Sequence, residues 1–320
     1  MDNKWTTEHI PDQTGKIALV TGGNSGLGYE TVKALGQARA HVVLACRNTE
    51  KGNVARDQLV QQTPATSIEV REIDLASLAS IRQYAEAFKT EHTRLDILVN
   101  NAGVMATPRR TTADGFELQF GTNHMGHFAL TGLLLEALLH TPDSRVITVS
   151  SIGERAGRIN FSNLMGEKFY ERWSAYNQSK LANILFAYEL QRRLKAAGSS
   201  TLSLAVHPGF AATELRTELR DRKTPFFQRL MGSFFESLSQ SVEMGVLPQL
   251  YAATAPGVQG GEYYGPSGFL ERTGYPRRLR SSRRSYDEAL ARKLWEVSEE
   301  LTGVKYTALA QGAVYDEGLP

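Results

Sequence analysis

Short apolar runs alternate with longer stretches of helical periodicity along most of the chain. The first run, residues 17–20, is apolar without interruption, which is typical of a strand buried on both faces of a sheet. The predicted strands are residues 17–20, 41–46, 66–73, 95–100, 145–150, 201–207 and 260–264. Strands and helices that take turns in this way predict βαβ units, right-handed crossovers and an α/β fold with a doubly wound parallel sheet.

The helical stretches carry recognisable end signals. Ser77 and Asp114 are predicted N-caps, and Asp114 would open a single helix over residues 114–139. Two connections, residues 152–172 and 210–240, are long for a compact domain of this kind. The second connection has apolar residues at helix-like spacing, which predicts either an amphipathic helix on the body or a surface that touches a membrane.

Charge and cysteine content narrow the class of protein. The 36 Lys and Arg residues nearly balance the 34 Asp and Glu residues, so no overall basic field favours nucleic acid as a partner. A local arginine cluster over residues 277–284 is interpreted as a solvated loop. The single cysteine, Cys46, excludes an internal disulfide and suits a reducing compartment. No run reaches the about eighteen apolar residues of a membrane span, so we expect a cytoplasmic protein, with peripheral membrane contact left open.

The segment after the first apolar run is rich in glycine and passes into a helical pattern. Its glycines are Gly22, Gly23, Gly26 and Gly28. Such a turn lets the backbone approach a diphosphate closely and directs the N–H groups of a helix N-terminus toward it. The segment is therefore predicted to hold a nucleotide, although glycine-rich turns also occur for plain steric reasons.

Polar residues that follow other predicted strands suggest which nucleotide this is. A site selective for NAD normally places an acid after the second strand, whereas a 2′-phosphate calls for a cation. Cys46 and Arg47 occupy this position and Lys51 follows one helical turn later, so the sequence favours NADP(H). After the third strand, Asp74 could accept a hydrogen bond from the adenine amino group.

Candidate catalytic groups follow the fifth strand. Ser150 and Ser151 end that strand, and Tyr176 and Lys180 stand four residues apart on a predicted helix. This spacing places the phenol and the ammonium on one helix face. A tyrosine has an ordinary pKa of about 10, but a neighbouring ammonium lowers it, so the phenol could exchange a proton with an alcohol oxygen. The spacing of two histidines at positions 124 and 127 suggests a metal site, but the sequence places no third ligand beside them, so no metal is expected.

Five motifs occur together and in order, and on them the chain resembles the short-chain dehydrogenase/reductase family over about residues 15–265. The motifs are Thr-Gly-x-x-x-Gly-x-Gly at 21–28, Asn-Asn-Ala-Gly at 100–103, Ser151, Tyr176-x-x-x-Lys180 and Pro208-Gly209. The resemblance implies a single Rossmann-type domain with a seven-stranded parallel sheet in the order 3-2-1-4-5-6-7. It divides the chain into an N-terminal extension (1–14), this domain (15–270) with a substrate-loop insertion at about 210–240, and a C-terminal extension (271–320).

The resemblance also implies residue roles. Tyr176 matches the general acid/base, Lys180 the residue that lowers its pKa, and Ser151 the group that hydrogen-bonds the substrate oxygen, with Ser150 as the fallback. Asn123 matches the residue that anchors a water in the proton relay. The implied cofactor-binding residues are Gly22, Asn24, Ser25, Gly26, Leu27, Gly28, Arg47, Asn48, Lys51, Asp74, Leu75, Asn101, Ala102, Gly103, Tyr176, Lys180, Pro208, Gly209 and Thr213.

Within the family, the chain is most similar to retinol dehydrogenases and light-dependent protochlorophyllide reductase. The segments 45–48, 166–170, 179–185 and 294–298 carry this likeness. The sequence shows no N-terminal membrane anchor of the kind common in animal retinol dehydrogenases, which argues against a retinoid substrate. It also has no second cysteine, which argues against pigment reduction.

The expected activity is an NADP(H)-dependent interconversion of a carbonyl and an alcohol on a small apolar substrate that is retinoid-, steroid- or lipid-like, or a xenobiotic. Two alternatives stay open, namely reduction of a carbon–carbon double bond and a non-catalytic NADP(H)-binding sensor or scaffold. The sequence also leaves open whether the protein is a monomer or a homodimer.

Overall fold

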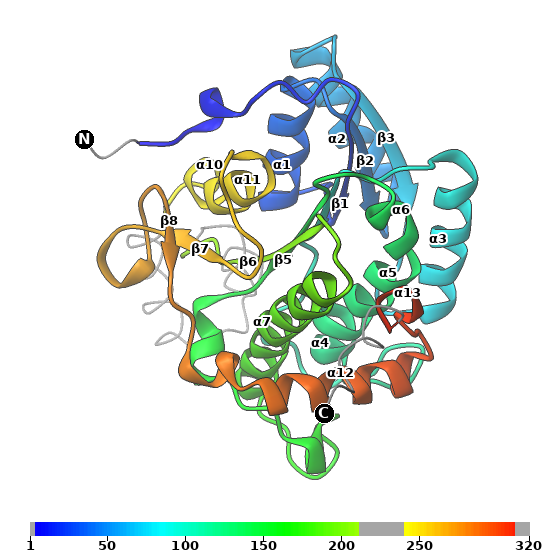
Figure 1. The fold of residues 1–320 in the computed structure, drawn as a ribbon, viewed down its shortest axis with the longest axis vertical. Coiled ribbons are helices and arrows are strands. Elements are labelled where there is room, and N and C mark those ends of the chain that lie inside the picture. The colour runs from blue at the N-terminus through cyan, green and yellow to red at the C-terminus, as the bar shows by residue number, and fades with distance from the viewer. Residues whose placement is uncertain (1–3, 211–239, 311–320) are drawn as a thin grey trace, which may run out of the picture.

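The computed structural model describes residues 4–210 and 240–310, and their strands form one sheet in the order β3-β2-β1-β4-β5-β6-β7-β8 (Figure 1). The strands are β1 (Ile17–Thr21), β2 (His41–Cys46), β3 (Ser67–Glu72), β4 (Ile97–Asn100), β5 (Arg145–Val149), β6 (Leu202–Val206), β7 (Tyr263–Pro266) and β8 (Pro276–Leu279). The first seven pair in parallel, which confirms the doubly wound α/β fold and the predicted order. All seven expected parallel strands are present. The sheet has an eighth strand as well, because the chain turns back after β7 and adds β8 antiparallel to it.

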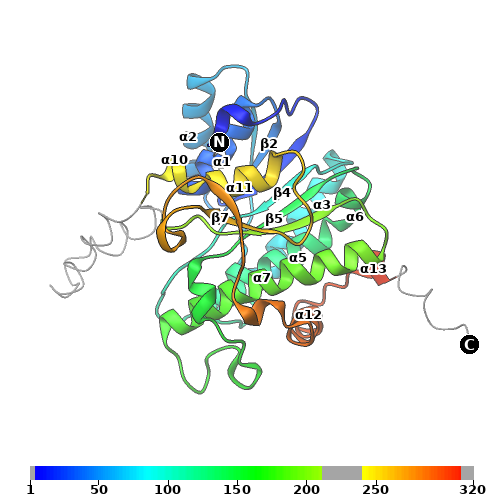
Figure 2. The same cartoon turned by 60° about the vertical axis from the view of Figure 1, so that its left-hand side comes forward.

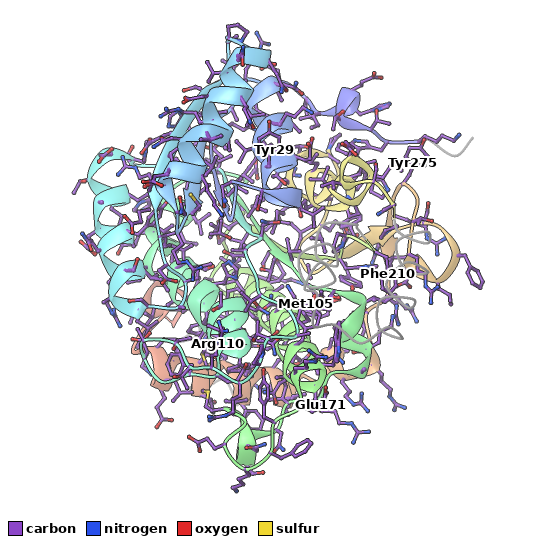
Figure 3. All side chains as sticks on the ribbon, turned by 180° about the vertical axis from the view of Figure 1, so that it is seen from behind. Tyr29, Met105, Arg110, Glu171, Phe210 and Tyr275 are labelled. Carbon is purple, nitrogen blue, oxygen red and sulfur yellow. The ribbon has the colours of Figure 1, made fainter. Side chains whose placement is uncertain are left out.

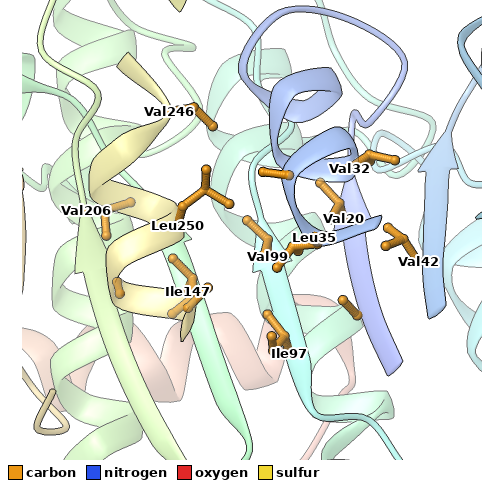
Figure 4. Packing of buried hydrophobic residues seen from close by; sticks show 14 of the residues in the cluster. Val20, Val32, Leu35, Val42, Ile97, Val99, Ile147, Val206, Val246 and Leu250 are labelled. Carbon is orange, nitrogen blue, oxygen red and sulfur yellow. The ribbon is translucent and has the colours of Figure 1, made fainter. Parts of the chain in front are cut away.

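One face of the sheet is covered by helices from both ends of the chain. These are α1 (Gly26–Gln37), α2 (Thr49–Gln62), α10 (Val242–Gly245) and α11 (Leu247–Thr254). Side chains alternate along each strand, so Ile97 and Val99 of β4 face this layer while Leu98 faces the other. Figure 4 shows Ile97 and Val99 beside Leu35 of α1 and Leu250 of α11. This two-sided burial explains why the strands are apolar without interruption.

The opposite face is covered by a second group of helices (Figure 2). They are α3 (Leu78–Glu91), α5 (Gly126–Leu133), α6 (Leu135–Leu139), α7 (Arg172–Ala196), α12 (Glu288–Thr302) and α13 (Thr307–Ala310). Trp295 of α12 packs edge-on against Phe128 of α5 with ring centroids 5.1 Å apart, and the Tyr306 hydroxyl donates to the Phe128 carbonyl oxygen at 2.7 Å. The described chain beyond residue 270 thus adds β8 to the sheet and α12 and α13 to this layer.

Short helices complete the described chain. They are α4 (Leu118–Phe120), the π-helical turn η2 (Gly121–Met125) and the 3-10 turns η1 (Thr7–His9), η3 (Ile152–Ala156), η4 (Phe161–Asn163), η5 (Phe269–Glu271) and η6 (Arg283–Tyr286). No helix in residues 4–210 and 240–310 is both long enough and apolar enough to cross a bilayer. Except for its end residues, the predicted insertion at about 210–240 lies outside the described part of the chain.

The predicted N-cap Ser77 is confirmed, because its hydroxyl accepts from the Ser80 N–H at the start of α3. The prediction of a single helix over residues 114–139 is wrong. Asp114 is not the N-cap of a helix that begins after it. Its carboxylate instead accepts from the N–H of Leu78, at the start of α3. Glu117 takes the N-cap role instead, and the helix then widens into η2 and breaks again at Leu134. A π-helical turn inside a helix often marks a functional position.

Candidate active site

A cavity of about 1060 Å³ lies at the carboxyl ends of the central strands, where a doubly wound sheet places its ligands. Its wall contains these predicted site residues: Gly22, Asn24, Ser25, Gly26, Leu27, Gly28, Asn101, Ala102, Gly103, Ser150, Ser151, Tyr176, Lys180, Pro208 and Gly209. The structure therefore brings together the glycine turn, the loop after β4 and the tyrosine–lysine pair. The predicted residues outside this wall are Arg47, Asn48, Lys51, Asp74, Leu75 and Asn123, and Thr213 lies outside the described residues.

The glycine turn leaves room for a close ligand. Gly22 and Gly26 have φ of +66° and +55°, a region that favours glycine. A Cβ on Gly28 would lie 2.2 Å from the Gly22 carbonyl oxygen, so the first turn of α1 can pass this close only without a side chain. Ser25 is the N-cap of α1 but forms no side-chain cap hydrogen bond, so the first N–H groups of α1 remain available to an anion in the cavity. The turn therefore fits a diphosphate.

Hydrogen bonds to Thr21, at the end of β1, hold the loop after β4 in place. The Thr21 hydroxyl accepts from the N–H groups of Asn101 and Ala102 at 2.9 and 3.0 Å. It also lies 2.9 Å from Nε2 of His127, a residue that burial keeps neutral by lowering its pKa to about 4. His127 Nδ1 lies 3.0 Å from the Asn123 carbonyl oxygen, so Nδ1 carries the proton and Nε2 accepts from Thr21.

Asn123 belongs to the π-helical turn and touches the cavity only through a neighbour. Its Oδ1 accepts from the Val104 N–H at 2.8 Å, and its Nδ2 donates to the Val104 carbonyl oxygen at 2.9 Å. Val104 lines the cavity, so the Asn123 side chain positions that segment of the wall. Sequence reasoning missed His127 as a member of this network, because it considered the two histidines only as a metal pair. In the fold, His124 contacts Ser298 instead, at 2.9 Å.

The two serines at the end of β5 have different surroundings. The Ser150 hydroxyl is buried and donates to the Lys180 carbonyl oxygen at 2.7 Å. The Ser151 hydroxyl is half-buried in the cavity wall and accepts from the Gly153 N–H at 3.2 Å, which leaves its own proton available to a ligand. This geometry favours Ser151 over Ser150 for contact with a substrate oxygen.

Tyr176 and Lys180 lie in the first half of α7, and both side chains are almost fully buried. The Lys180 ammonium lies 5.7 Å from the centroid of the Tyr176 ring and donates to the Val149 carbonyl oxygen at 3.3 Å. Trp173 stands one turn earlier on the same helix face and meets the Tyr176 ring edge-on at 6.3 Å. Sequence reasoning missed Trp173, although its position three residues before Tyr176 places it on that face.

The predicted residues after β2 and β3 flank the cavity. Arg47 and Lys51 are exposed, and the Asn48 side chain caps α2 by accepting from the Lys51 N–H at 2.8 Å. The Asp74 carboxylate accepts from the Ala76 N–H at 2.9 Å, and Leu75 is buried. Because β2 pairs with β1 in register as far as Thr21, the segment at Arg47 lies next to the glycine turn.

The last part of the wall comes from the loop after β6. The Phe210 N–H donates to the Arg272 carbonyl oxygen at 3.0 Å, and the Arg272 guanidinium lies 5.3 Å from the Phe210 ring centroid. Figure 3 marks Phe210 and Met105, two apolar lining residues from the loops after β6 and β4. The glycine turn thus forms a polar part of the cavity wall, and Met105, Phe210 and Trp173 add apolar surface to it, Trp173 next to Tyr176.

The sheet order and a glycine turn at the end of β1 define a Rossmann-type fold of the dinucleotide-binding class. The chain belongs to the short-chain dehydrogenase family, whose model, described as "short chain dehydrogenase", matches residues 16–224.

Its relatives place it in the retinol dehydrogenase-like branch. It is 41% identical to human retinol dehydrogenase 11 over 292 residues, which cover 91% of this chain and 86% of that protein. It is 40% identical to mouse retinol dehydrogenase 13 over 302 residues, covering 93% and 86% respectively. Among solved structures, an uncharacterized protein from Mycobacterium paratuberculosis is 39% identical with a TM-score of 0.78, covering 95% of this chain and 99% of that one.

Proposed function

We propose that this chain is an NADP(H)-dependent oxidoreductase that interconverts a carbonyl and an alcohol on a small apolar substrate. The observation that carries the proposal is that Ser151, Tyr176 and Lys180 share one cavity wall with the glycine turn. NADP(H), when bound, would supply or accept the hydride. The close-approach glycines and the unpartnered helix N-terminus described above support the fit of such a cofactor.

In this proposal, three residues of the cavity wall have different roles at the substrate oxygen. The Tyr176 phenol gives its proton to the oxygen in reduction and takes it back in oxidation. The Lys180 ammonium, buried beside the ring, favours the phenolate form that this exchange requires. The Ser151 hydroxyl donates to the oxygen and stabilises negative charge that develops on it.

The preference for NADP(H) rests on the end of β2. Arg47 and Lys51 are exposed cations there, and neither Cys46 nor Arg47 supplies the acid that would bind ribose hydroxyls in an NAD site. The 2′-phosphate of NADP(H) matches such cations. Fluorescence titration with NADPH and NADH tests this assignment, and tighter binding of NADH would overturn it.

The apolar substrate is supported by Met105, Trp173 and Phe210, which line the same cavity as Tyr176. The names of the relatives, retinol dehydrogenases 11 and 13, add support for a retinoid-like alcohol or aldehyde. A panel of aldehydes, ketones and alcohols, read at the nicotinamide absorbance, would rank the substrate classes. The cytoplasmic location and the choice between monomer and homodimer stay predictions, which cell fractionation and size-exclusion chromatography with light scattering would test.

The deciding experiment replaces the phenol alone. Tyr176→Phe should bind NADPH like the wild type and lose roughly 10²–10⁴-fold in turnover, the size expected when a positioned acid/base is removed. Tyr286→Phe, a change at an exposed tyrosine outside the cavity, is the matched control and should keep full turnover. Wild-type turnover by the Tyr176→Phe protein would refute the mechanism.

A pair of serine variants tests the second group. Ser151→Ala should lower the turnover number with little change in NADPH affinity, because it removes a donor to the substrate oxygen. Ser150→Ala should act through stability instead, since its hydroxyl bonds to the Lys180 carbonyl oxygen. Equal losses of turnover with equal stability in the two variants would contradict the assignment.

Two other functions give different results in the same assays. Product analysis by mass spectrometry and NMR separates reduction of a carbon–carbon double bond from reduction of a carbonyl. A sensor or scaffold would bind NADPH and turn over nothing across the panel.

A further inference from the structure

Three potential metal ligands converge near the amino ends of β2 and β3, whereas the cavity lies at the carboxyl ends of the strands. His41 begins β2, Glu69 lies on β3, and His92 is the C-cap of α3. Glu69 Oε2 lies 3.2 Å from His41 Nε2 and 3.3 Å from His92 Nε2. All three ligand atoms lie within 4.8 Å of one another.

These separations match the edges of a metal coordination polyhedron. Zinc binds imidazole nitrogen at about 2.0–2.1 Å and carboxylate oxygen at about 2.0–2.2 Å, and tetrahedral angles then set neighbouring ligand atoms about 3.3 Å apart. Both separations that involve Glu69 Oε2 have this value.

The surroundings hold the three side chains in place. Arg71 hydrogen-bonds the other oxygen of Glu69, Oε1, and also pairs with Glu91, so the guanidinium fixes the carboxylate while Oε2 stays directed at the two rings. The charges of Glu69, Arg71 and Glu91 add up to one negative charge, which favours a cation. The His92 ring packs on Phe88 with centroids 4.7 Å apart.

A hydrogen bond behind His41 allows it to become a ligand without losing a partner. Ser67 Oγ lies 2.7 Å from His41 Nδ1. Without a metal, His41 can donate through Nε2–H to Glu69 while Nδ1 accepts from the Ser67 hydroxyl. If the proton moves to Nδ1, the Ser67 oxygen accepts it, and the Nε2 lone pair becomes available.

We propose that His41, Glu69 and His92 bind one divalent transition-metal ion of the zinc type, with water in the fourth position. The two imidazoles and one carboxylate are ligands that such ions prefer. The ion would tie the end of α3 to β2 and β3 and so stabilise this edge of the sheet. The sequence led us to expect no metal, because residues 41, 69 and 92 form a cluster only once the strands pair.

The test uses tag-free full-length protein stripped with a chelator. Titration with Co²⁺ should give one equivalent bound with the visible absorption of a low-symmetry N,O site, and calorimetry with Zn²⁺ should give the same stoichiometry. His41→Gln and His92→Gln should each weaken Zn²⁺ binding at least about tenfold, the loss caused by changing even an outer partner of a metal ligand. His9→Gln, at an exposed histidine outside the cluster, is the control and should bind like the wild type.

Thermal unfolding completes the design. Saturating Zn²⁺ should raise the melting temperature of the wild type and the His9→Gln control, and should not raise that of the two cluster variants. Melting in EDTA reports whether the variants fold normally without metal. The proposal is overturned if the wild type binds neither Co²⁺ nor Zn²⁺ at about 100 μM, since the cluster would then be only hydrogen-bonded, or if the cluster variants bind as tightly as the control.

Discussion

Replacing Thr21 by Val would remove the hydroxyl that joins the buried His127 ring to two half-buried N–H groups and would leave the shape of the side chain nearly unchanged. The N–H groups of Asn101 and Ala102 and the Nε2 of His127 would each lose a hydrogen-bond partner. A buried polar group left without a partner costs about 1–3 kcal/mol, so the loss at His127 should lower the free energy of unfolding by at least about 1 kcal/mol, and the two half-buried N–H groups add to it. Thr21 and His127 are both buried, which keeps bulk water from replacing the bond between them.

Thr148, on β5 of the same sheet, is a matched control. It is as deeply buried as Thr21, and its hydroxyl oxygen has no hydrogen-bond partner among the described residues. Thr148→Val therefore exchanges an unsatisfied hydroxyl for a methyl group and should change stability by less than about 1 kcal/mol, or increase it.

Urea unfolding followed by tryptophan fluorescence measures both variants. We expect Thr21→Val to lower the midpoint without changing the slope, and Thr148→Val to leave the midpoint unchanged or raise it. NADPH titration adds a second readout, because Asn101 and Ala102 line the cavity and should bind more weakly once they are loosened. Equal midpoints for the two variants would show that Thr21 does not hold this loop.

Three further predictions concern other parts of the molecule. The His207 imidazole, whose Nε2 lies 3.6 Å from Glu271 Oε2, and then the hydrogen bonds from Arg155 lower the pKa of Glu271 to about 2. Its carboxylate therefore adds stability above its ordinary pKa and loses it as the pH falls toward 2. Glu271→Gln should therefore cost on the order of 1 kcal/mol at neutral pH after solvent screening, and urea midpoints measured from about pH 7 to pH 3 should show the difference shrinking below about pH 4.5. Gly28→Ala should abolish NADPH binding in fluorescence titration, because the new Cβ would lie 2.2 Å from a carbonyl oxygen of the same turn. Arg47→Glu should reverse the ratio of NADPH to NADH affinities if the cation holds the 2′-phosphate, and an unchanged ratio would contradict that role.

The sequence predicted the parallel sheet well because each strand carries its own signal. The run at residues 17–20 is apolar throughout, and the glycine turn that follows it has a local steric cause, so both could be predicted without knowing any partner. β8 could not, because its arginines resemble a solvated loop until β7 lies beside them. The helix at residues 114–139 was mispredicted because the carboxylate of Asp114 bonds to the start of a different helix.

In the candidate site, too, features within one segment could be predicted and contacts between distant segments could not. Tyr176 and Lys180 are linked by spacing on one helix, which a sequence displays directly. The hydrogen bond between Thr21 and His127 joins residues 106 positions apart, and neither local segment contains a pattern that predicts it. Networks of this kind come from strand order, so they emerge only when the fold is known.

The antiparallel strand β8 has a consequence for the behaviour of the chain at high concentration. An open sheet edge invites another chain to add a strand, and such addition begins aggregation. β8 places Pro276, which has no N–H to donate, and the exposed Arg277 and Arg278 on one margin of the sheet. On the other margin, β3 carries Glu69 and Arg71. Proline on one margin and charged side chains on both disfavour strand addition, so crowded copies of the chain should stay apart at their sheet edges.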